Sequence, residues 1–315
     1  MMDINQEIAK LDFTKAPKGL YEPIGYTLEG GGKRIRPTLA LMACRLFGGK
    51  DEEVLPVALA LEVFHNFTLL HDDLMDRADT RRGRETVWKK WNANTAVLSG
   101  DEMLIEAYKL LAQLPAAKLA QVLPLFNKMA SEICEGQQLD MDFESLSLRE
   151  VSIADYMEMI RLKTSVLLAT ALQIGAIIAG ADEGQQRAVY EYGINLGLAF
   201  QIQDDLLDCF GDAATFGKPI GGDIVEGKKT FMLLTAYKEG GDAFETQFTA
   251  LRTAANQDKI RAVKELYERL RVRSCAEEEI VRLTNRALAQ LAGVPQNMET
   301  ERLRQLAQQL MNRTK

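Results

Sequence analysis

The stretch His71-Asp72-Asp73-Leu74-Met75-Asp76 closes an apolar segment, residues 54–76, whose pattern predicts one long helix. Three carboxylates fall within five residues of each other. At 100° per residue, Asp72 and Asp76 share one helix face one turn apart, and Asp73 lies beside them. Carboxylates this close repel one another, and burying them is costly unless a cation lies among them. Taken alone, the motif is equally compatible with a solvated acidic helix end.

The same pattern recurs as Asp204-Asp205-Leu206-Leu207-Asp208, at the end of an apolar segment that predicts a helix over residues 185–210. Two clusters of three carboxylates can hold hard cations through oxygen ligands. Magnesium in particular is commonly shared between one or two carboxylates and substrate phosphates. The pair of motifs therefore indicates a metal-bound phosphate site, which one motif does not.

The composition predicts a nearly all-α protein. The chain has 315 residues, of which 47% are hydrophobic and 26% charged, and it contains only eight prolines. The commonest residues are good helix formers. No linker rich in Pro, Gly or Ser divides the chain, so residues 1–315 are predicted to form a single domain. Pro17 and Pro23 are expected to break the helical pattern of residues 1–28. Further helices are predicted over residues 94–113, 117–142, 153–180 (one long helix or a kinked pair) and 231–311.

Charge and cysteine usage exclude several classes of protein. The net charge of −7 and the pI of about 5.2 argue against a nucleic-acid-binding protein. Four widely spaced cysteines without a CxxC pattern predict buried thiols in a reducing cytoplasm. The N-terminus has no basic-then-apolar signal, so secretion is not expected. The most apolar window, residues 165–181, is interpreted as a core helix, and no membrane span is predicted.

Basic residues cluster where an anion would have to be held. Gly30-Gly31-Gly32 is followed by Lys33, Arg34 and Arg36, which is the chemistry of an anion-binding loop. The alternative is an ordinary turn with solvated cations. Arg81 and Arg82 follow the first acidic motif, and guanidinium groups suit phosphate recognition well. A second loop, residues 216–230, repeats the glycines and lysines.

Two further polar positions lie on apolar helices. His65 precedes Asp72 by seven residues and shares nearly the same helix face, which favours a functional role over that of a core histidine. Lys163-Thr164 interrupts an apolar stretch, where the lysine either snorkels to solvent or serves an anion. The chain has no phosphate-binding GxxxxGK[ST] loop and no candidate Ser/His/Asp triad. Together, the acidic motifs and the basic residues could bind a diphosphate through metal ions and cations. Apolar residues beside such a site suggest a substrate with a hydrophobic chain and a diphosphate head.

These motifs together resemble the trans-isoprenyl diphosphate synthases (polyprenyl synthetases) from Gly31 to the C-terminus. The resemblance rests on segments that occur in the family's order: GGKRIRP (31–37), His65, HDDLMD (71–76), Arg81-Arg82, GQQLD (136–140), KT (163–164), FQIQDDLLD (200–208), GKPIGGD (217–223) and EGKKT (226–230). It implies an all-α isoprenoid synthase fold of roughly ten or more helices around a central cavity. It also implies a homodimer that condenses an allylic diphosphate with isopentenyl diphosphate, head-to-tail, using about three Mg²⁺.

The resemblance also implies roles for individual residues. Direct metal ligands would be Asp72, Asp76 and Asp204, with auxiliary or water-mediated roles for Asp73, Asp205, Asp208 and Asp223. Contacts to the allylic diphosphate would come from Arg81, Lys163 and Lys218. The isopentenyl diphosphate site would comprise the Gly32 backbone, Lys33, Arg36, His65 and Arg82. Thr164 and Gln201 would border the developing carbocation, and Lys228 would assist at the phosphate end.

Product length depends on what blocks the floor of the cavity. Helix geometry favours Thr68, which lies under Asp72, whereas the family pattern gives the larger role to Phe67. A bulky ring at position 67 implies a C15–C20 product, and the small Thr68 favours C20. The first motif lacks the two-residue insertion common in bacterial farnesyl synthases, which leaves the product class open, and Ser165 replaces a Gly or Ala of many relatives.

Three alternatives remain. The first is a longer-chain polyprenyl diphosphate synthase. The second is a terpene cyclase or head-to-head synthase on the same fold, against which the intact second motif at Asp204 and the basic loop at Lys33 both argue. The third is a non-catalytic subunit of a prenyl synthase pair, but such subunits typically lose aspartates and none is lost here.

Overall fold

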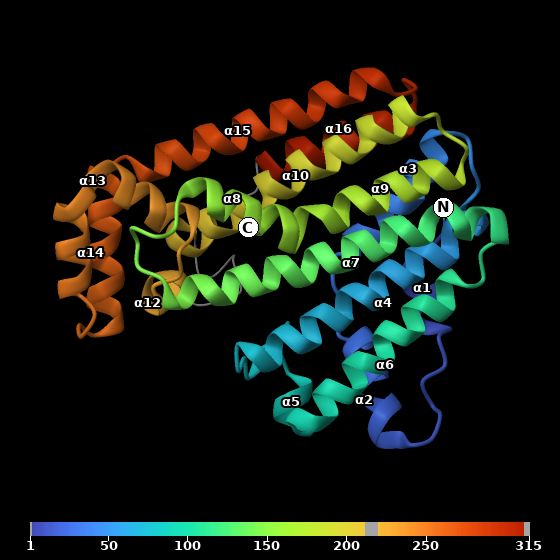
Figure 1. Cartoon of the computed structure of the whole chain (residues 1–315), viewed down its shortest axis with the longest axis horizontal. Coiled ribbons are helices and arrows are strands. Elements are labelled where there is room, and N and C mark those ends of the chain that lie inside the picture. The colour runs from blue at the N-terminus through green and yellow to red at the C-terminus, as the bar shows by residue number, and fades with distance from the viewer. Residues whose placement is uncertain (1, 212–219, 312–315) are drawn as a thin grey trace. The chain divides into compact units, whose positions relative to one another are not determined.

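The computed structural model describes residues 2–211 and 220–311, with side chains through residue 309. Within these ranges the protein is helical apart from one hairpin, in which β1 (Thr80–Arg81) pairs antiparallel with β2 (Arg84–Glu85). The predicted all-α class is therefore confirmed (Figure 1).

The chain divides into two compact units. The first comprises Met1–Phe126 and Thr170–Gln186, and the second Asn127–Ala169 and Arg187–Lys315. Their boundaries fall inside three helices, α7 (Ala116–Ser145), α9 (Val166–Ile178) and α10 (Glu183–Phe210). The single-domain assignment stays a prediction.

The first unit is built around the long helix α4. Its helices besides α7 are α1 (Ile4–Ala9), α2 (Lys18–Glu29), α3 (Ile35–Leu46), α4 (Asp51–Met75), α5 (Val87–Lys90) and α6 (Ala93–Leu111). α4 packs against α3 and α6, and Figure 1 shows α4 and α6 side by side. Three acidic residues occupy the first turn of α4, where they complement the helix dipole. At the other end, the Asp76 amide bonds back to the Asp72 carbonyl, so the acidic motif caps the helix.

The second unit carries the second acidic motif. Beyond α7, α9 and α10 its elements are α8 (Ile153–Ile160), the π-helical turn η1 (Arg161–Ser165), α12 (Gly222–Glu226), α13 (Phe231–Ala250), α14 (Asn256–Arg269), α15 (Val272–Gln290), the 3₁₀ turn η2 (Leu291–Gly293) and α16 (Met298–Met311). Over the predicted range 153–180, α8, the π-helical turn and α9 follow one another directly, as one helical stretch from Ile153 to Ile178.

Two helices, Asp51–Met75 and Ile153–Ile178, are long and apolar enough to cross a membrane by length and composition. Most of each apolar window is buried in the protein, 61% and 78% respectively. Core helices of globular proteins meet the same criteria, so this is weak evidence for a membrane span.

Candidate active site

The first acidic motif lies beside the hairpin in the first unit. Arg81 Nε is 2.7 Å from Asp73 Oδ1, and Arg81 Nη2 is 3.6 Å from Asp72 Oδ2. Burial raises the pKa of Asp73 to about 6, although the neighbouring Arg81 opposes the shift. The Arg81 guanidinium is therefore the cation that accompanies two of the three clustered carboxylates in this conformation.

The hairpin turn sends the two adjacent arginines to different partners. Arg82 and Gly83 connect β1 to β2, and both have left-handed φ values, 53° and 75°, as type I′ hairpin turns require. Arg81 on the strand faces the aspartates, whereas the Arg82 guanidinium donates to the Gly31 carbonyl. A Cβ on Gly32 would come within 2.9 Å of that guanidinium, and Gly32 has a φ of 133°. Gly32 is thus needed for both its backbone conformation and the close approach of Arg82.

His65 and Arg36 contribute to a positively charged environment at the same loop. The pKa of His65 is lowered well below 6.5, chiefly by burial and then by Arg36, Arg82 and Arg81, so its imidazole is neutral. Burial lowers the pKa of Arg36 to about 10, which leaves it charged at neutral pH. The Nε of Arg36 is buried without a hydrogen-bond partner in the described part of the chain. A diphosphate oxygen would satisfy such a donor.

Of the predicted isopentenyl diphosphate residues, the structure thus gathers Gly32, Arg36, His65 and Arg82 near one loop. Lys33 is exposed on that loop. A recess of about 40 Å³ is lined by Asp73, Arg81 and Arg82, among others.

In the second unit, Lys163 and Thr164 lie on the π-helical turn η1. Lys163 Nζ donates to Asp140 Oδ2 at 2.6 Å, and Thr164 Oγ1 donates to Gln201 Oε1 at 3.3 Å. Gly136 of α7 makes room for this turn, because a Cβ there would lie 2.3 Å from the Lys163 amide nitrogen. No role was predicted for Asp140, although it closes the GQQLD segment.

The second acidic motif is buried at Asp205. Tyr156 Oη donates to Asp205 Oδ2 at 2.5 Å, and Gln201 Nε2 donates to its other oxygen at 3.2 Å. Burial, followed by repulsion from Asp223, raises the pKa of Asp205 to about 8. The Asp223 amide donates to Asp208 Oδ2 at 3.1 Å, which brings α12 onto the motif. Tyr156 was missed by sequence analysis, since nothing local distinguishes it from other core tyrosines.

Two further basic residues, Lys228 and Lys218, were predicted to contact phosphate. Lys228 is half-buried, and its Nζ is 3.6 Å from Oε2 of the exposed Glu226. Lys218 lies outside the described residues.

The candidate chain-length residues lie on α4. The Phe67 ring packs edge-on against Phe64 and His71, with centroids 5.5 and 4.9 Å away. Thr68 Oγ1 donates to the His65 carbonyl at 2.8 Å, which is a local helix contact. Phe67 therefore belongs to an aromatic cluster one turn from the acidic motif.

The donor chemistry of both motifs fits magnesium. Carboxylate oxygens are the ligands that this ion prefers, and burial raises the pKa of Asp73 and Asp205 because it disfavours an uncompensated negative charge. In the conformation described, however, no three Asp, Glu, His or Cys side chains among residues 2–211 and 220–309 converge closely enough to hold an ion. Asp73 instead faces Arg81, and Asp205 faces Tyr156.

Comparisons with known proteins agree on the family. The polyprenyl synthetase family model matches residues 17–270. A geranylgeranyl diphosphate synthase from Methanosarcina mazei is 41% identical over 226 residues, covering 71% of this chain and 69% of the relative. The crystal structure of geranylgeranyl pyrophosphate synthetase from Pyrococcus horikoshii Ot3 has a TM-score of 0.93 at 34% identity, covering 98% of this chain and 95% of that one. A polyprenyl synthase from Caulobacter crescentus CB15, complexed with calcium and isoprenyl diphosphate, has a TM-score of 0.88 at 31% identity, covering 99% of this chain and 94% of that one. The resemblance drawn from the motifs is thereby confirmed: the chain belongs to the polyprenyl synthetase family.

Proposed function

We propose that this protein is a short-chain trans-prenyltransferase that condenses an allylic diphosphate with isopentenyl diphosphate, head-to-tail. The observation that carries the proposal is the pairing, within one unit, of an acidic helix end with a separate cationic loop. Asp72 and Asp73 lie with Arg81, whereas Arg36 and Arg82 lie with a neutral His65. Such a unit can take one diphosphate through a metal and a second one directly through guanidinium groups.

The allylic diphosphate is the substrate that ionises. Asp72, Asp76 and Asp204 would hold magnesium, with Asp73, Asp205, Asp208 and Asp223 in auxiliary roles. When bound, the metal supplies electrostatic stabilisation of the departing diphosphate. Arg81, Lys163 and Lys218 add positive charge for the same leaving group. The carbon–oxygen bond breaks, and its electron pair leaves with the diphosphate.

The isopentenyl double bond then attacks the allylic carbocation, forming the new carbon–carbon bond, and a proton passes to the released diphosphate. Arg36, Arg82 and the Gly32 backbone would hold the isopentenyl diphosphate, with Lys33 and the neutral His65 completing the site. Gln201 is fixed between Thr164 and Asp205, so its amide oxygen faces the Thr164 hydroxyl. These two oxygens would border the cation, and Lys228 would assist at the phosphate end.

We propose a C20 product. The names of the relatives from Methanosarcina mazei and Pyrococcus horikoshii support the upper end of the predicted C15–C20 range. Phe67 would set that limit, because its ring is held in place by Phe64 and His71. A longer-chain product is the alternative that product sizing would reveal.

A homodimer and a cytoplasmic location complete the proposal. Val97, Leu98 and Ile105 of α6 are apolar but 43%, 59% and 49% exposed, as expected for a surface that a second copy covers. All four cysteines are free, which suits a reducing compartment. Cys44 and Cys209 are buried as predicted, but Cys134 is exposed and Cys275 is half-buried, so the prediction of buried thiols was wrong for these two.

One assay tests the activity. Purified protein with Mg²⁺, isopentenyl diphosphate and each of the C5, C10 and C15 primers should yield C20 diphosphate. Asp72→Ala and Asp204→Ala should each reduce turnover by about two orders of magnitude or more at unchanged helicity, since each removes a carboxylate that would hold magnesium at the leaving group. Near-normal turnover in either variant would contradict the metal assignment.

A further inference from the structure

Arg34 has no role in the reaction proposed above, although it lies between Lys33 and Arg36. Its backbone is left-handed, with φ 47° and ψ 38°, at the residue that precedes α3. A non-glycine residue rarely adopts this conformation, so the surrounding contacts must stabilise it. The side chain of Arg34 is buried, in contrast to that of Lys33, which is exposed. The basic loop, residues 31–37, therefore turns Arg34 inward and Lys33 outward.

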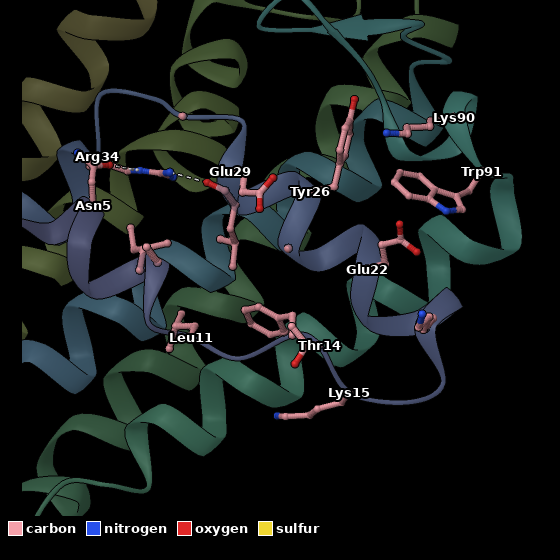
Figure 2. Close-up of a pocket in the computed structure, with 17 residues that line it drawn as sticks. Asn5, Leu11, Thr14, Lys15, Glu22, Tyr26, Glu29, Arg34, Lys90 and Trp91 are labelled. Atoms are coloured by element: carbon pink, nitrogen blue, oxygen red, sulfur yellow. Dashed lines mark hydrogen bonds between the residues drawn. The ribbon is translucent and has the colours of Figure 1, made fainter.

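Each nitrogen of the Arg34 guanidinium has a hydrogen-bond acceptor. Nη1 donates to Glu62 Oε1 at 2.6 Å, and Nη2 donates to the Leu28 carbonyl at 2.6 Å. Nε donates to Asn5 Oδ1 of α1 at 3.2 Å, a contact that Figure 2 shows at the wall of the N-terminal pocket. Asn66 Nδ2 also donates to Glu62 Oε1, at 3.0 Å. With side-chain exposures of 6% and 2%, Arg34 and Glu62 form a buried ion pair.

This arrangement excludes a direct substrate role for Arg34. Its charge is compensated by Glu62, and each of its three nitrogens already donates to an acceptor within the protein. The N-terminal pocket that Arg34 helps to line, of about 820 Å³, contains none of the predicted substrate or metal residues. What the pair does instead is join the basic loop to α4 at Glu62, three residues before His65 and one turn before Asn66.

The pair fixes one side of the loop, and a different contact fixes the other. Arg82 donates to the Gly31 carbonyl. The Arg34 carbonyl accepts from the amide and the hydroxyl of Thr38, and these bonds stabilise the first turn of α3. The backbone between these anchors presents Gly32 and Lys33, and Arg36 follows two residues later. Their placement relative to His65 therefore depends on Arg34 and Glu62.

We propose that Arg34 and Glu62 act as a positioning pair that sets the affinity for isopentenyl diphosphate, with Asn5 tying α1 into the same network. This inference rests on the proposed function. It predicts that weakening the pair impairs binding of isopentenyl diphosphate and spares the allylic substrate, whose proposed contacts Arg81 and Lys163 lie outside the basic loop.

Whether Glu62→Gln raises or lowers the affinity for isopentenyl diphosphate distinguishes a positioning role of the pair from a purely electrostatic one. Removing this carboxylate adds net positive charge beside Arg36 and Arg82, because Glu62 is a counter-charge to both. If the pair acted through charge alone, the variant would bind the isopentenyl diphosphate anion more tightly. If it positions the loop, binding weakens despite the added positive charge.

The test is steady-state kinetics of the full-length protein, with both substrates varied and the melting temperature followed. Glu62→Gln and Arg34→Lys should raise the KM for isopentenyl diphosphate about tenfold or more and leave the allylic KM within about twofold. Asn5→Ala, which leaves the ion pair in place, should raise the same KM about twofold to threefold. This milder variant keeps the inference testable if Glu62→Gln does not fold.

Arg45 and Asp51 provide matched controls. They form a bidentate pair between the end of α3 and the start of α4, with both distances 2.6 Å. Arg45→Lys and Asp51→Asn should lower the melting temperature without changing either KM.

Four results would overturn the inference. A lower isopentenyl KM in Glu62→Gln would assign the pair an electrostatic role, and equal rises in both substrate KM values would make it merely structural. An unchanged isopentenyl KM in Arg34→Lys would mean that the pair does not position the loop. An unchanged isopentenyl KM in Asn5→Ala would mean that α1 takes no part in the network. A wild-type protein that forms no prenyl product would instead refute the proposed function.

Discussion

At the scale of single residues, adjacent basic residues contact different partners because the backbone directs their side chains to different sides. Arg81 faces the aspartates while Arg82 contacts the glycine loop, and Arg34 is buried while Lys33 is exposed. In both cases a residue with positive φ, Arg82 or Arg34, makes the separation possible. Basic residues that look equivalent in the sequence thus differ in their partners and in their burial.

Phe67 provides the residue-scale prediction for product length. Phe67→Ala removes a ring that packs against Phe64 and His71, so the cavity floor should deepen and products should lengthen beyond C20 by one or more C5 units. Chromatography of radiolabelled products measures this. Thr68→Ala is the matched control. The Thr68 hydroxyl donates to the His65 carbonyl within the same helix, so this variant should leave the product length unchanged. The reverse pattern would support the helix-geometry alternative.

His65 provides a prediction about pH. Its folded-state pKa lies well below 6.5, whereas the unfolded chain takes up a proton near that value. Protonation therefore favours the unfolded state, and the contribution to stability is complete above pH 6.5 and lost as pH falls below it. Each pH unit below 6.5 should cost up to about 1.4 kcal/mol, until the folded-state pKa is reached.

Melting curves between pH 5 and 8 test this, with His65→Gln as the comparison. The variant should lose less stability on acidification than the wild type. Identical acid slopes for the two proteins would mean that His65 is not buried as a neutral imidazole.

At the scale of elements, the π-helical turn is the feature that places Lys163. π-helical turns are rare and often occur at functional sites. Here Gly136 and Gly197 flank the turn, and a Cβ at either position would lie within 2.6 Å of backbone atoms of residues 162–165. Lys163 can then reach Asp140, and Thr164 can reach Gln201.

Gly136→Ala should therefore abolish activity and destabilise the protein by about 1–3 kcal/mol or more, because backbone atoms cannot yield to the new methyl group. Gly19→Ala in α2 is the control: nothing lies within 4 Å of its Cβ position, so stability should rise by about 0.4–1 kcal/mol. Urea titrations of both variants measure the difference. A fully stable and active Gly136→Ala protein would contradict the close packing of α7 on this turn.

One element prediction was wrong. Pro23 was expected to break the N-terminal helical pattern, but it lies inside α2, which begins directly after Pro17. Pro23 cannot donate to the carbonyl of Gly19, so it costs α2 one intrahelical hydrogen bond, but the helix continues through it to Glu29. Pro17 does mark a boundary, as the residue that precedes the helix.

At the scale of the whole molecule, the exposed apolar face of α6 leads to a prediction about assembly. Leu98→Glu should convert a dimer to a monomer, because it places a charge where apolar contact is expected. Sedimentation analysis measures the change. Val281→Glu on α15, at a site 47% exposed, is the control and should leave the assembly intact. If the wild-type protein is a monomer, or if Leu98→Glu leaves a dimer intact, the apolar face of α6 is not a dimer interface.

The sequence alone determined the helical class, the two acidic motifs and the approximate ends of the long helices before residue 211, because periodicity and charge clustering are local properties of the chain. It predicted residues 231–311 only as a helical region, which the structure divides into α13, α14, α15 and α16. It also located the glycine-rich basic loop and, through motif order, the family. α4 was predicted over residues 54–76 and is observed over Asp51–Met75.

Only the tertiary structure decided the partners of those residues. Asp140 for Lys163, Tyr156 for Asp205 and Glu62 for Arg34 are contacts between segments far apart in sequence. Their identity depends on backbone conformations and close approaches that no local pattern encodes: the left-handed φ of Arg34, and the missing side chain of Gly136. The sequence therefore indicated which chemistry the protein has, and packing decided which partners its cations have and which of them are buried.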